Sequence, residues 1–391
     1  MAAPLPRTNP TADAVLQRLV ALLPAQRPLA LHEPLLGGLE EQYTSDCLRS
    51  GWISSAGPFV DRFEQELADY TGIAHAVATV NGTSALHTCL MLAGVQAGDE
   101  VIAPALTFVG TLNPIAYQHA VPHLVDCEAD TLGIDPLKLE AHLARIAELR
   151  DGVCFNRETG RPIRALVVVH VLGIPAQMDA LAALAERWHI ELIEDAAEAL
   201  GSWRDQRHAG SWSRLAALSF NGNKIISSGG GGALLTGDAQ LAQQARHLST
   251  TAKLPHAWAF EHDRVGFNYR LPNVNAALGC AQLQRLDGHL QSKRRLFAHY
   301  RDGLGDLDGC EFHQPPGDTR SNHWLNLLLM PDRAQRDALL QAAKDEGLLL
   351  RPLWNPMQSL PMFADCPRAE LPVTQDIWQR GVNLPSSPGL A

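Results

Sequence analysis

The feature that most constrains the fold is a series of short, nearly continuous apolar runs between about residues 60 and 235. The runs AHAVATV (74–80), EVIAPALTF (100–108), VPHLVDCE (121–128), ALVVVHVLG (165–173) and IELIED (190–195) read as strands. SALHTCLMLAG (84–94) and AQMDALAALAERW (176–188) have helical spacing between them. Strands without polar alternation are buried on both faces, which is typical of a parallel sheet covered by helices. We therefore predict an α/β fold with a mostly parallel central sheet and helices on both faces.

Polar or aromatic groups stand where several of these strands end. They are Asn81-Gly82-Thr83-Ser84, Thr107-Phe108, His170 and Asp195. Ligands of open α/β sheets bind at the carboxyl ends of the strands. The sequence therefore predicts a crevice lined by these residues.

A chain of 391 residues exceeds the size at which a single core usually stops growing, so we expect more than one domain. We predict an N-terminal helix and arm at 1–40, with Val15, Leu19 and Leu23 at helical spacing, and a large domain at 41–285. The composition then changes to a charged helix, short strands and a Pro-rich end, which predicts a smaller α+β domain at 286–391. The segment DGVCFNRETGRP (151–162) reads as a surface insertion.

Charge and cysteine usage exclude several classes of protein. A net charge of −10 argues against a nucleic-acid surface, which needs a basic stripe. The seven cysteines are scattered without a CxxC pair, as expected for reduced thiols in the cytoplasm and not for a disulfide framework or a zinc site. No apolar run is long enough to suggest a membrane span, and no histidine lies in a metal-binding motif, so we expect neither membrane nor metal.

One lysine stands in an unusual setting, the segment SFNGNKIISSGGGG (219–232). A nucleotide P-loop has glycine before its lysine and Ser or Thr after it, whereas Lys224 lies between Asn223 and Ile225. Burial among apolar groups favours the neutral form of an amine, and a neutral amine is what Schiff-base chemistry requires. A surface lysine on a loop is the alternative.

Three further features admit both a structural and a functional interpretation. The NGTSAL segment (81–86) could simply cap a helix, or its N–H groups and hydroxyls could bind an anion. Asp195 could be a helix cap or the partner of a cation, and Phe108 a core residue or a flat face for a ligand. Together with Lys224 they supply what pyridoxal 5'-phosphate needs: an amine for the aldehyde, a carboxylate for the ring nitrogen, an aromatic face and phosphate donors.

The motifs NGTSAL, PALTF, HVLGIPAQMD, IEDAAEALG, SFNGNK and GFNYRLPNVNAALG, in this order from residue 81 to 279, resemble the DegT/StrS-type sugar aminotransferases. The resemblance covers about residues 31–385 and implies a fold-type-I aminotransferase. SFNGNKIISSGGGG and the segment from Leu31 to Val60 are most similar to the LegC-like branch, which makes legionaminic-acid or bacillosamine-type sugars.

The resemblance also implies roles for individual residues. Lys224 becomes the Schiff-base lysine and Asp195 the partner of the pyridine nitrogen; Phe108 stacks on the ring. The remaining cofactor residues are Gly82, Thr83, Ser84 and Ser219 on the phosphate, Asn268 from the neighbouring subunit, and Glu198, which stands where the family often has His or Gln. The substrate residues it implies are Trp52, Ser55, Arg270, Arg351 and Gln358, and we add His170 from its place at a strand end, with packing as its alternative role.

The function that follows is transfer of an amino group from L-glutamate to the keto carbon, at C4, of a nucleotide-linked keto-deoxy-hexose such as UDP-4-keto-6-deoxy-N-acetylhexosamine. Pyridoxamine 5'-phosphate would be the intermediate form of the cofactor, and the enzyme a cytoplasmic homodimer with shared active sites. The alternatives are a transferase acting on a free keto-sugar acid, and a regulatory protein that binds pyridoxal phosphate without turnover. A sugar dehydratase would carry His in place of Lys224, and a nicotinamide oxidoreductase would need a GxGxxG after a strand.

Overall fold

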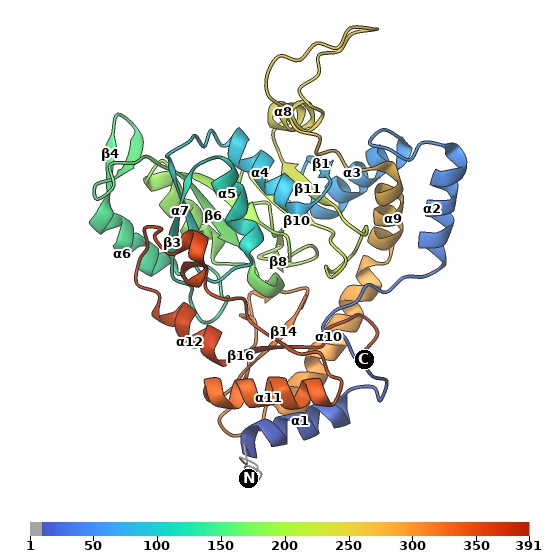
Figure 1. Cartoon of the computed structure of the whole chain (residues 1–391), viewed down its shortest axis with the longest axis vertical. Helices are drawn as coiled ribbons and strands as arrows, with labels where there is room; N and C mark the ends of the chain where they lie inside the picture. The colour runs from blue at the N-terminus through green and yellow to red at the C-terminus, as the bar shows by residue number, and fades with distance from the viewer. Residues whose placement is uncertain (1–9, 391) are drawn as a thin grey trace, which may run out of the picture.

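The computed structural model describes residues 10–390 and has at its centre a seven-stranded sheet in the order β1-β11-β10-β7-β6-β2-β3 (Figure 1). The strands are β1 (His75–Thr79), β2 (Glu100–Pro104), β3 (Val121–Val125), β6 (Ile163–Val169), β7 (Glu191–Asp195), β10 (Leu215–Ser219) and β11 (Gly232–Thr236). From β10 to β3 every pairing is parallel. The α/β prediction is confirmed.

The exception is β11, which pairs antiparallel with both β1 and β10. β10 and β11 are joined only by the loop of residues 220–231. Because that loop contains no helix to carry the chain back across the sheet, β11 returns in the opposite direction. The lysine-bearing segment is therefore the connection between two adjacent central strands.

Helices cover both faces of the sheet. One face packs against α4 (Gly82–Leu92), α5 (Asn113–Tyr117) and α8 (Ala239–Ser249). The other packs against α3 (Pro58–Thr71) and α9 (Asn273–Gln284) near β1, and against α6 (Pro136–Ile146) and α7 (Met178–Arg187) near β3. Helix α2 (Gly38–Ser50) lies beside α9. The apolar runs of the sequence are thus buried between two layers of helices, as the absence of polar alternation requires.

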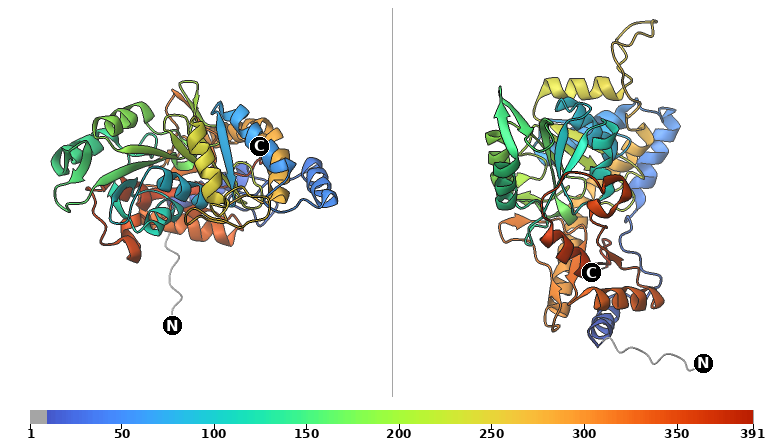
Figure 2. Two further views of the ribbon diagram at one scale, coloured as in Figure 1. Left: turned by 90° about the horizontal axis from the view of Figure 1, so that it is seen from above. Right: turned by 60° about the vertical axis from the view of Figure 1, so that its left-hand side comes forward.

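A second, four-stranded antiparallel sheet lies beside the first, in the order β12-β14-β16-β15. Its elements are β12 (Glu311–Phe312), β14 (Asn326–Leu329), β15 (Arg351–Pro352) and β16 (Gly381–Leu384), with α10 (Leu286–Leu304), α11 (Arg333–Asp345) and α12 (Pro372–Arg380). Helix α1 (Pro10–Leu22) packs Val15 and Leu19 against α10 and α11, so its apolar stripe is a packing surface (Figures 1 and 2). The domain limits of the sequence analysis remain a prediction.

Two smaller sheets complete the fold. β8 (Trp203–Arg204) pairs with β9 (Arg207–His208) and β13 (Thr319–Arg320), and β4 (Ala147–Arg150) pairs with β5 (Val153–Asn156). The segment 151–162, which was expected to be a surface insertion, forms part of this β4–β5 hairpin and is mostly exposed, with Cys154 and Asn156 buried. Asn156 donates a hydrogen bond to Glu100, so the hairpin is attached to the start of β2.

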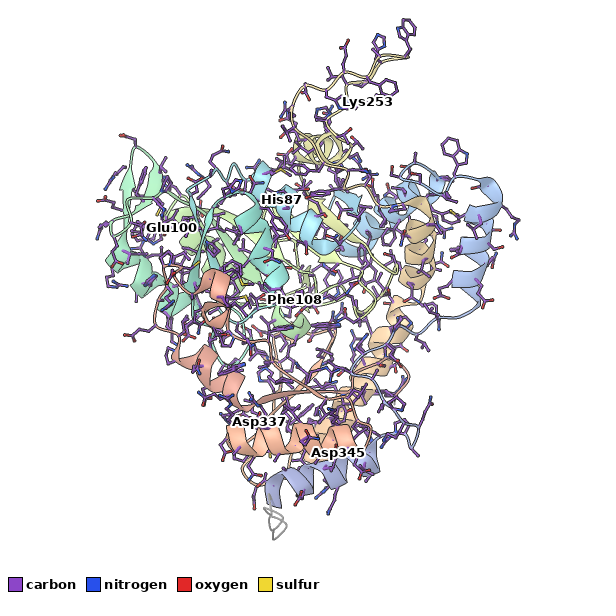
Figure 3. All side chains as sticks on the ribbon, in the orientation of Figure 1. His87, Glu100, Phe108, Lys253, Asp337 and Asp345 are labelled. Atoms are coloured by element: carbon purple, nitrogen blue, oxygen red, sulfur yellow. The ribbon has the colours of Figure 1, made fainter. Side chains whose placement is uncertain are left out.

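The segment between α8 and α9 projects from the body at the top of Figure 1. We call residues 253–265 the arm; Lys253 at its base is labelled in Figure 3. Trp258, Phe260 and Val265 on the arm are each more than four-fifths exposed. Among residues 10–390, no helix is long and apolar enough to cross a membrane.

Candidate active site

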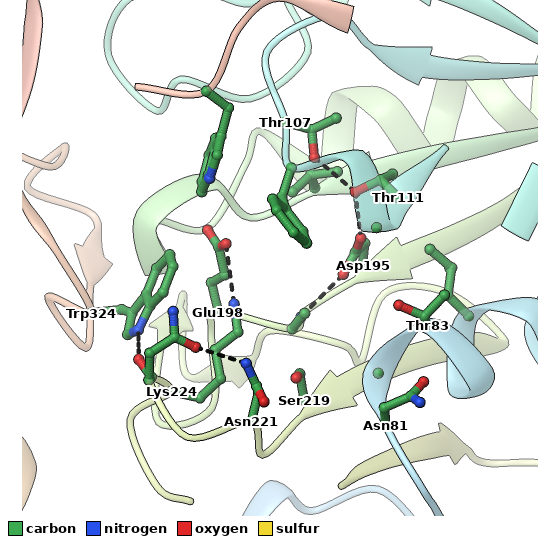
Figure 4. A pocket seen from close by; sticks show the side chains of 18 residues that line it. Asn81, Thr83, Thr107, Thr111, Asp195, Glu198, Ser219, Asn221, Lys224 and Trp324 are labelled. Atoms are coloured by element: carbon green, nitrogen blue, oxygen red, sulfur yellow. Dashed lines mark hydrogen bonds and ion pairs between the residues drawn. The ribbon is translucent and has the colours of Figure 1, made fainter. Parts of the chain in front are cut away.

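A cavity of about 220 Å³ lies at the carboxyl ends of β7 and β10. The start of α4 lines one part of it, and Trp324 and Trp354, next to strands of the four-stranded sheet, line another. The cavity is lined by Asn81, Gly82, Thr83, Leu86, Thr107, Phe108, Gly110, Thr111, Val169, Asp195, Ala197, Glu198, Ser219, Asn221, Asn223, Lys224, Trp324 and Trp354. Figure 4 shows Lys224, Glu198 and Trp324 on one side of this cavity and Asn81 and Thr83 on the other. The crevice predicted at the strand ends is therefore present.

Lys224 reaches the cavity because its loop is fixed on both sides. Phe220 is buried in the core and lies edge-on to Phe63, and its backbone N–H and C=O bond to Gly231 and Ser228. Beyond the lysine, Ile225 and Ile226 are buried. The side chain of Lys224 is 12% exposed, with Nζ 3.3 Å from Oε1 of Glu198. The lysine is therefore directed into the cavity and not toward bulk solvent.

Asp195, the last residue of β7, is held by hydrogen bonds at both carboxylate oxygens. The hydroxyl of Thr111 donates to Oδ2 at 2.8 Å, and the N–H of Ala197 donates to Oδ1 at 3.2 Å. Burial raises the pKa of Asp195, and these two hydrogen bonds oppose that rise. A buried carboxylate in this position can pair with a cationic group of a ligand.

The start of α4 provides anion donors at the other side of the cavity. The side chain of Asn81 caps the helix by accepting the N–H of Ser84 at 2.7 Å, which leaves the N–H groups of Gly82 and Thr83 without intrahelical acceptors. A Cβ on Gly82 would lie 2.8 Å from Cβ of Ser219. Glycine is therefore needed for the helix terminus to approach Ser219 so closely. Capping and anion binding, which were alternatives from the sequence, are compatible here.

Aromatic rings form the remaining walls. Phe108 is half-exposed (Figure 3) and its ring lies 6.3 Å from that of Trp354. Trp354 in turn stacks on Trp324, with centroids 6.4 Å apart. Trp324 donates its indole N–H to the carbonyl of Asn223 at 2.6 Å. Trp324, which lies just before β14 of the four-stranded sheet, thus connects that sheet to the loop of residues 220–231, which we call the lysine loop.

Seven of the predicted cofactor residues line this one cavity: Gly82, Thr83, Phe108, Asp195, Glu198, Ser219 and Lys224. Two do not. Ser84 is buried within α4, behind the residues that face the cavity. Asn268 is exposed at the base of the arm, where its backbone bridges to Thr250.

Of the predicted substrate residues, none lines the cavity. His170 is fully buried and donates to Glu194 at 3.0 Å while accepting the N–H of Ala176, so it does not face the cavity and its role toward a substrate stays a prediction. Arg270 forms an ion pair of 2.6 Å with Glu64. The others are Trp52 and Arg351, which are exposed, and Ser55 and Gln358, which are half-buried.

Sequence reasoning missed Thr111, Asn221, Trp324 and Trp354. Thr111 lies only three residues after Phe108, and the PALTF motif could have been extended to it. Trp324 lies 100 residues after Lys224 in the chain, and no local pattern distinguishes it from a core residue. Within residues 10–390, no cluster of His, Cys, Asp and Glu is arranged to hold a metal ion.

A buried lysine opposite a buried carboxylate, at the carboxyl edge of a mostly parallel sheet, defines an α/β enzyme of the aminotransferase type. Residues 35–391 match the DegT/DnrJ/EryC1/StrS aminotransferase family. The chain belongs to this family, as the sequence motifs indicated.

Individual relatives agree with this assignment. EpsN of Bacillus subtilis (strain 168), whose name proposes a pyridoxal phosphate-dependent aminotransferase, is 36% identical over 92% of this chain and 91% of its own. GDP-perosamine synthase of Caulobacter vibrioides is 35% identical, covering 93% of this chain and 94% of its own. The crystal structure of the aminotransferase TlmJ from Streptoalloteichus hindustanus matches with a TM-score of 0.84 at 28% identity, over 93% of this chain and 94% of that one.

Proposed function

We propose that this protein is a pyridoxal phosphate-dependent aminotransferase that moves the amino group of L-glutamate to C4 of a nucleotide-linked keto-deoxy-hexose. A UDP-4-keto-6-deoxy-N-acetylhexosamine is the acceptor that the LegC-like motifs favour. The observation that carries the proposal is the position of Lys224, whose Nζ lies in the same cavity as the carboxylate of Asp195.

The residues of the cavity fit pyridoxal phosphate. The phosphate would be held by Gly82, Thr83 and Ser219. The start of α4 can approach Ser219 this closely only because Gly82 has no Cβ. Asp195 would pair with the ring nitrogen, Phe108 would cover one face of the ring, and Lys224 would bond to the aldehyde carbon. A helix terminus alone contributes about 0.3–2 kcal/mol to anion binding, so the covalent link and the hydroxyls account for much of the affinity.

When bound, pyridoxal phosphate supplies an electron sink for the carbon that gives up or receives the amine. Asp195, fixed by Thr111 and Ala197, would place its carboxylate beside the ring nitrogen and so favour the protonated form of that nitrogen. The amine of Lys224 would be the base that removes the Cα proton of L-glutamate, and it would return a proton in the second half of the reaction. The ring of Trp324, whose centroid lies 4.0 Å from Nζ of Lys224, would shield that side of the amine from water.

The acceptor must extend beyond this cavity. A volume of about 220 Å³ is below the roughly 300–1,000 Å³ of pockets that enclose a drug-sized ligand, so cofactor and nucleotide sugar do not both fit within it. GDP-perosamine synthase is named for a nucleotide-linked amino sugar, which supports a nucleotide-linked acceptor here. The nucleotide of this protein's own acceptor remains a prediction from the branch resemblance.

A homodimer in the cytoplasm is part of the proposal. Large apolar side chains are exposed at two places that a second copy could cover. They are Trp258 and Phe260 on the arm, and Trp52 after α2. The predicted cofactor residue Asn268 stands at the base of this arm, away from its own cavity. All seven cysteines are unpaired, as a reducing compartment would have them.

The test of the proposed function is an absorbance spectrum of the purified protein with pyridoxal phosphate, followed by borohydride reduction and peptide mass spectrometry. We expect a band near about 410–430 nm and a reduced adduct on the peptide containing Lys224. Lys224→Ala should lose band, adduct and amino transfer, whereas Lys344→Ala, at an exposed position on α11, should keep all three. Failure of the wild-type protein to form the adduct would refute the proposal.

L-Glutamate without a sugar should then bleach the band and release 2-oxoglutarate. UDP- and GDP-linked 4-keto-6-deoxyhexoses, each added to the bleached protein, are compared by how fully they restore the band. An unchanged band with L-glutamate would remove the donor from the proposal while leaving the cofactor. Restoration only by a keto-sugar acid without a nucleotide would overturn the assignment of the acceptor.

A further inference from the structure

Nζ of Lys224 lies between a carboxylate oxygen and an aromatic face. Oε1 of Glu198 lies 3.3 Å from Nζ, and the ring of Trp324 lies under Nζ with its centroid 4.0 Å away. Carboxylates and aromatic faces each attract an ammonium ion, and more strongly when water is excluded. The amine must lose a proton before it can bond to the aldehyde carbon of the cofactor, so a proton acceptor is needed within reach of Nζ.

Glu198 is rigidly placed for this contact. Its second oxygen, Oε2, accepts the N–H of Leu172 at 2.9 Å, and its backbone carbonyl accepts Nδ2 of Asn322 at 2.7 Å. Its side chain is 5% exposed. One carboxylate oxygen is thus anchored to the backbone, while the other is directed at Lys224.

We propose that Glu198 is the proton acceptor for Lys224. In this step the N–H bond at Nζ would break and an O–H bond would form at Oε1, which leaves the neutral amine with the electron pair that it needs to bond to the aldehyde carbon of the cofactor. The C=O bond of the aldehyde would break as the C–N bond forms, and its oxygen would leave as water with two of the three ammonium protons, the first of them delivered by Glu198. Glu198 is then a carboxylate again, so atoms and charge balance without another reactant. The proposal rests on the proposed function.

Asp195, the other carboxylate of the cavity, is less suited to this role because its oxygens already accept hydrogen bonds from Thr111 and Ala197. Burial raises the pKa of Glu198, the charge of Lys224 opposes this rise, and the nearby charge of Asp195 adds to it. A carboxyl group in such surroundings can hold a proton near neutral pH. Two histidines also face these charged groups. The charge of His170 acts on Asp195, and the charge of Lys224 acts on His32.

The test is a pH titration of the visible absorbance of the holoenzyme, with Glu198→Gln compared to the wild-type protein. A carboxylate beside the linked nitrogen of Lys224 should make that nitrogen keep its proton to higher pH. Its removal should therefore lower the pH at which the band near about 410–430 nm is half lost by about one to three units. Glu198→Asp, which keeps the charge but retracts it from Nζ, should give an intermediate midpoint.

Glu100→Gln is the matched control, because Glu100 is also a fully buried carboxylate but lies at the start of β2, outside the cavity lining (Figure 3). Its midpoint should equal that of the wild-type protein. An unshifted midpoint in folded Glu198→Gln or Glu198→Asp, with the cofactor fixed to Lys224 by borohydride, would overturn the role of Glu198 alone. Absence of any borohydride adduct in the wild-type protein would overturn the proposed function as well.

Discussion

The hydroxyl of Thr111 donates a 2.8 Å hydrogen bond to Oδ2 of Asp195, and the hydroxyl of Thr107 lies 2.7 Å from that of Thr111. Because Thr111 uses its proton on the carboxylate, Thr107 must be the donor of the second bond. This chain of hydroxyls connects the end of β2 to the end of β7. It holds the carboxylate of Asp195 in one orientation inside the cavity.

We expect Thr111→Val to weaken cofactor binding by about 10- to 100-fold, since a hydrogen bond to a charged group contributes about 1.5–3 kcal/mol. The carboxylate loses a donor that favours its ionised form, so its pKa should rise and its pairing with a cationic ring nitrogen should weaken. Thr111→Ser, which retains the hydroxyl, is the control. Fluorescence titration with pyridoxal phosphate measures the effect, and equal affinity in the two variants would contradict it.

Gly82→Ala should disturb the anion donors at the start of α4. The added Cβ would lie 2.8 Å from Cβ of Ser219 and 3.2 Å from the backbone oxygen of Leu218, so the helix terminus must move away from β10. We expect about a 5- to 150-fold loss of affinity for pyridoxal phosphate, since such overpacking typically costs about 1–3 kcal/mol.

Gly222→Ala is the matched control for this substitution. Gly222 lies in the lysine loop, and a Cβ there would meet nothing within 4 Å. The same titration should give wild-type affinity for this variant. If Gly82→Ala also bound the cofactor normally, the close approach of α4 to β10 would not matter for binding.

Stability should fall as the pH decreases from about 6.5 to about 4. Burial lowers the pKa of His142 and of His208 from 6.5 to about 4. In this window the unfolded chain takes up protons that the folded protein does not, so each histidine reduces the free energy of unfolding by up to about 1.4 kcal/mol per pH unit. Urea denaturation at pH 7 and pH 5 measures the loss.

His208→Gln should make that pH dependence shallower by about one proton, although the variant is less stable at every pH. His208 accepts the N–H of Gly201 and donates to the carbonyl of Ala209, and glutamine does not reproduce both bonds. Substitution of the exposed His299 by Gln serves as control. Buried carboxylates such as Asp195 are common to all these proteins, so their contribution cancels in the comparison. An unchanged pH dependence in His208→Gln would contradict the interpretation.

The double substitution Trp258→Ala and Phe260→Ala on the arm should weaken the proposed homodimer by at least about 100-fold. Aromatic residues at the centre of an interface typically contribute about 2 kcal/mol or more each. Leu137→Ala changes an equally exposed apolar residue on α6 and should leave the association unchanged. Analytical ultracentrifugation measures both, and a monomeric wild-type protein would refute the homodimer.

Much of the site was predictable because each of its parts is local in sequence. Lys224 was singled out by a loop too small and apolar to solvate it, and Asp195 and Thr83 by their positions at the ends of apolar runs. Strand ends of a parallel sheet meet at one edge, so these residues had to come together. The same argument does not bring His170 into the cavity lining, because a residue at a strand end can point to either face of the sheet. Its side chain points to the opposite face, toward Glu194.

The sequence by itself determined the central sheet, the family and the lysine, since apolar periodicity and short motifs depend on nearest neighbours along the chain. Only the tertiary structure decided the direction of β11, the hydroxyl chain on Asp195 and the position of Lys224 between Glu198 and Trp324. Glu198 lies 26 residues before Lys224, and Trp324 lies 100 residues after it. The first contact depends on the pairing of β7 with β10 in the central sheet, and the second on how the four-stranded sheet packs against it. Both are set by summed burial across the whole chain and not by any local pattern.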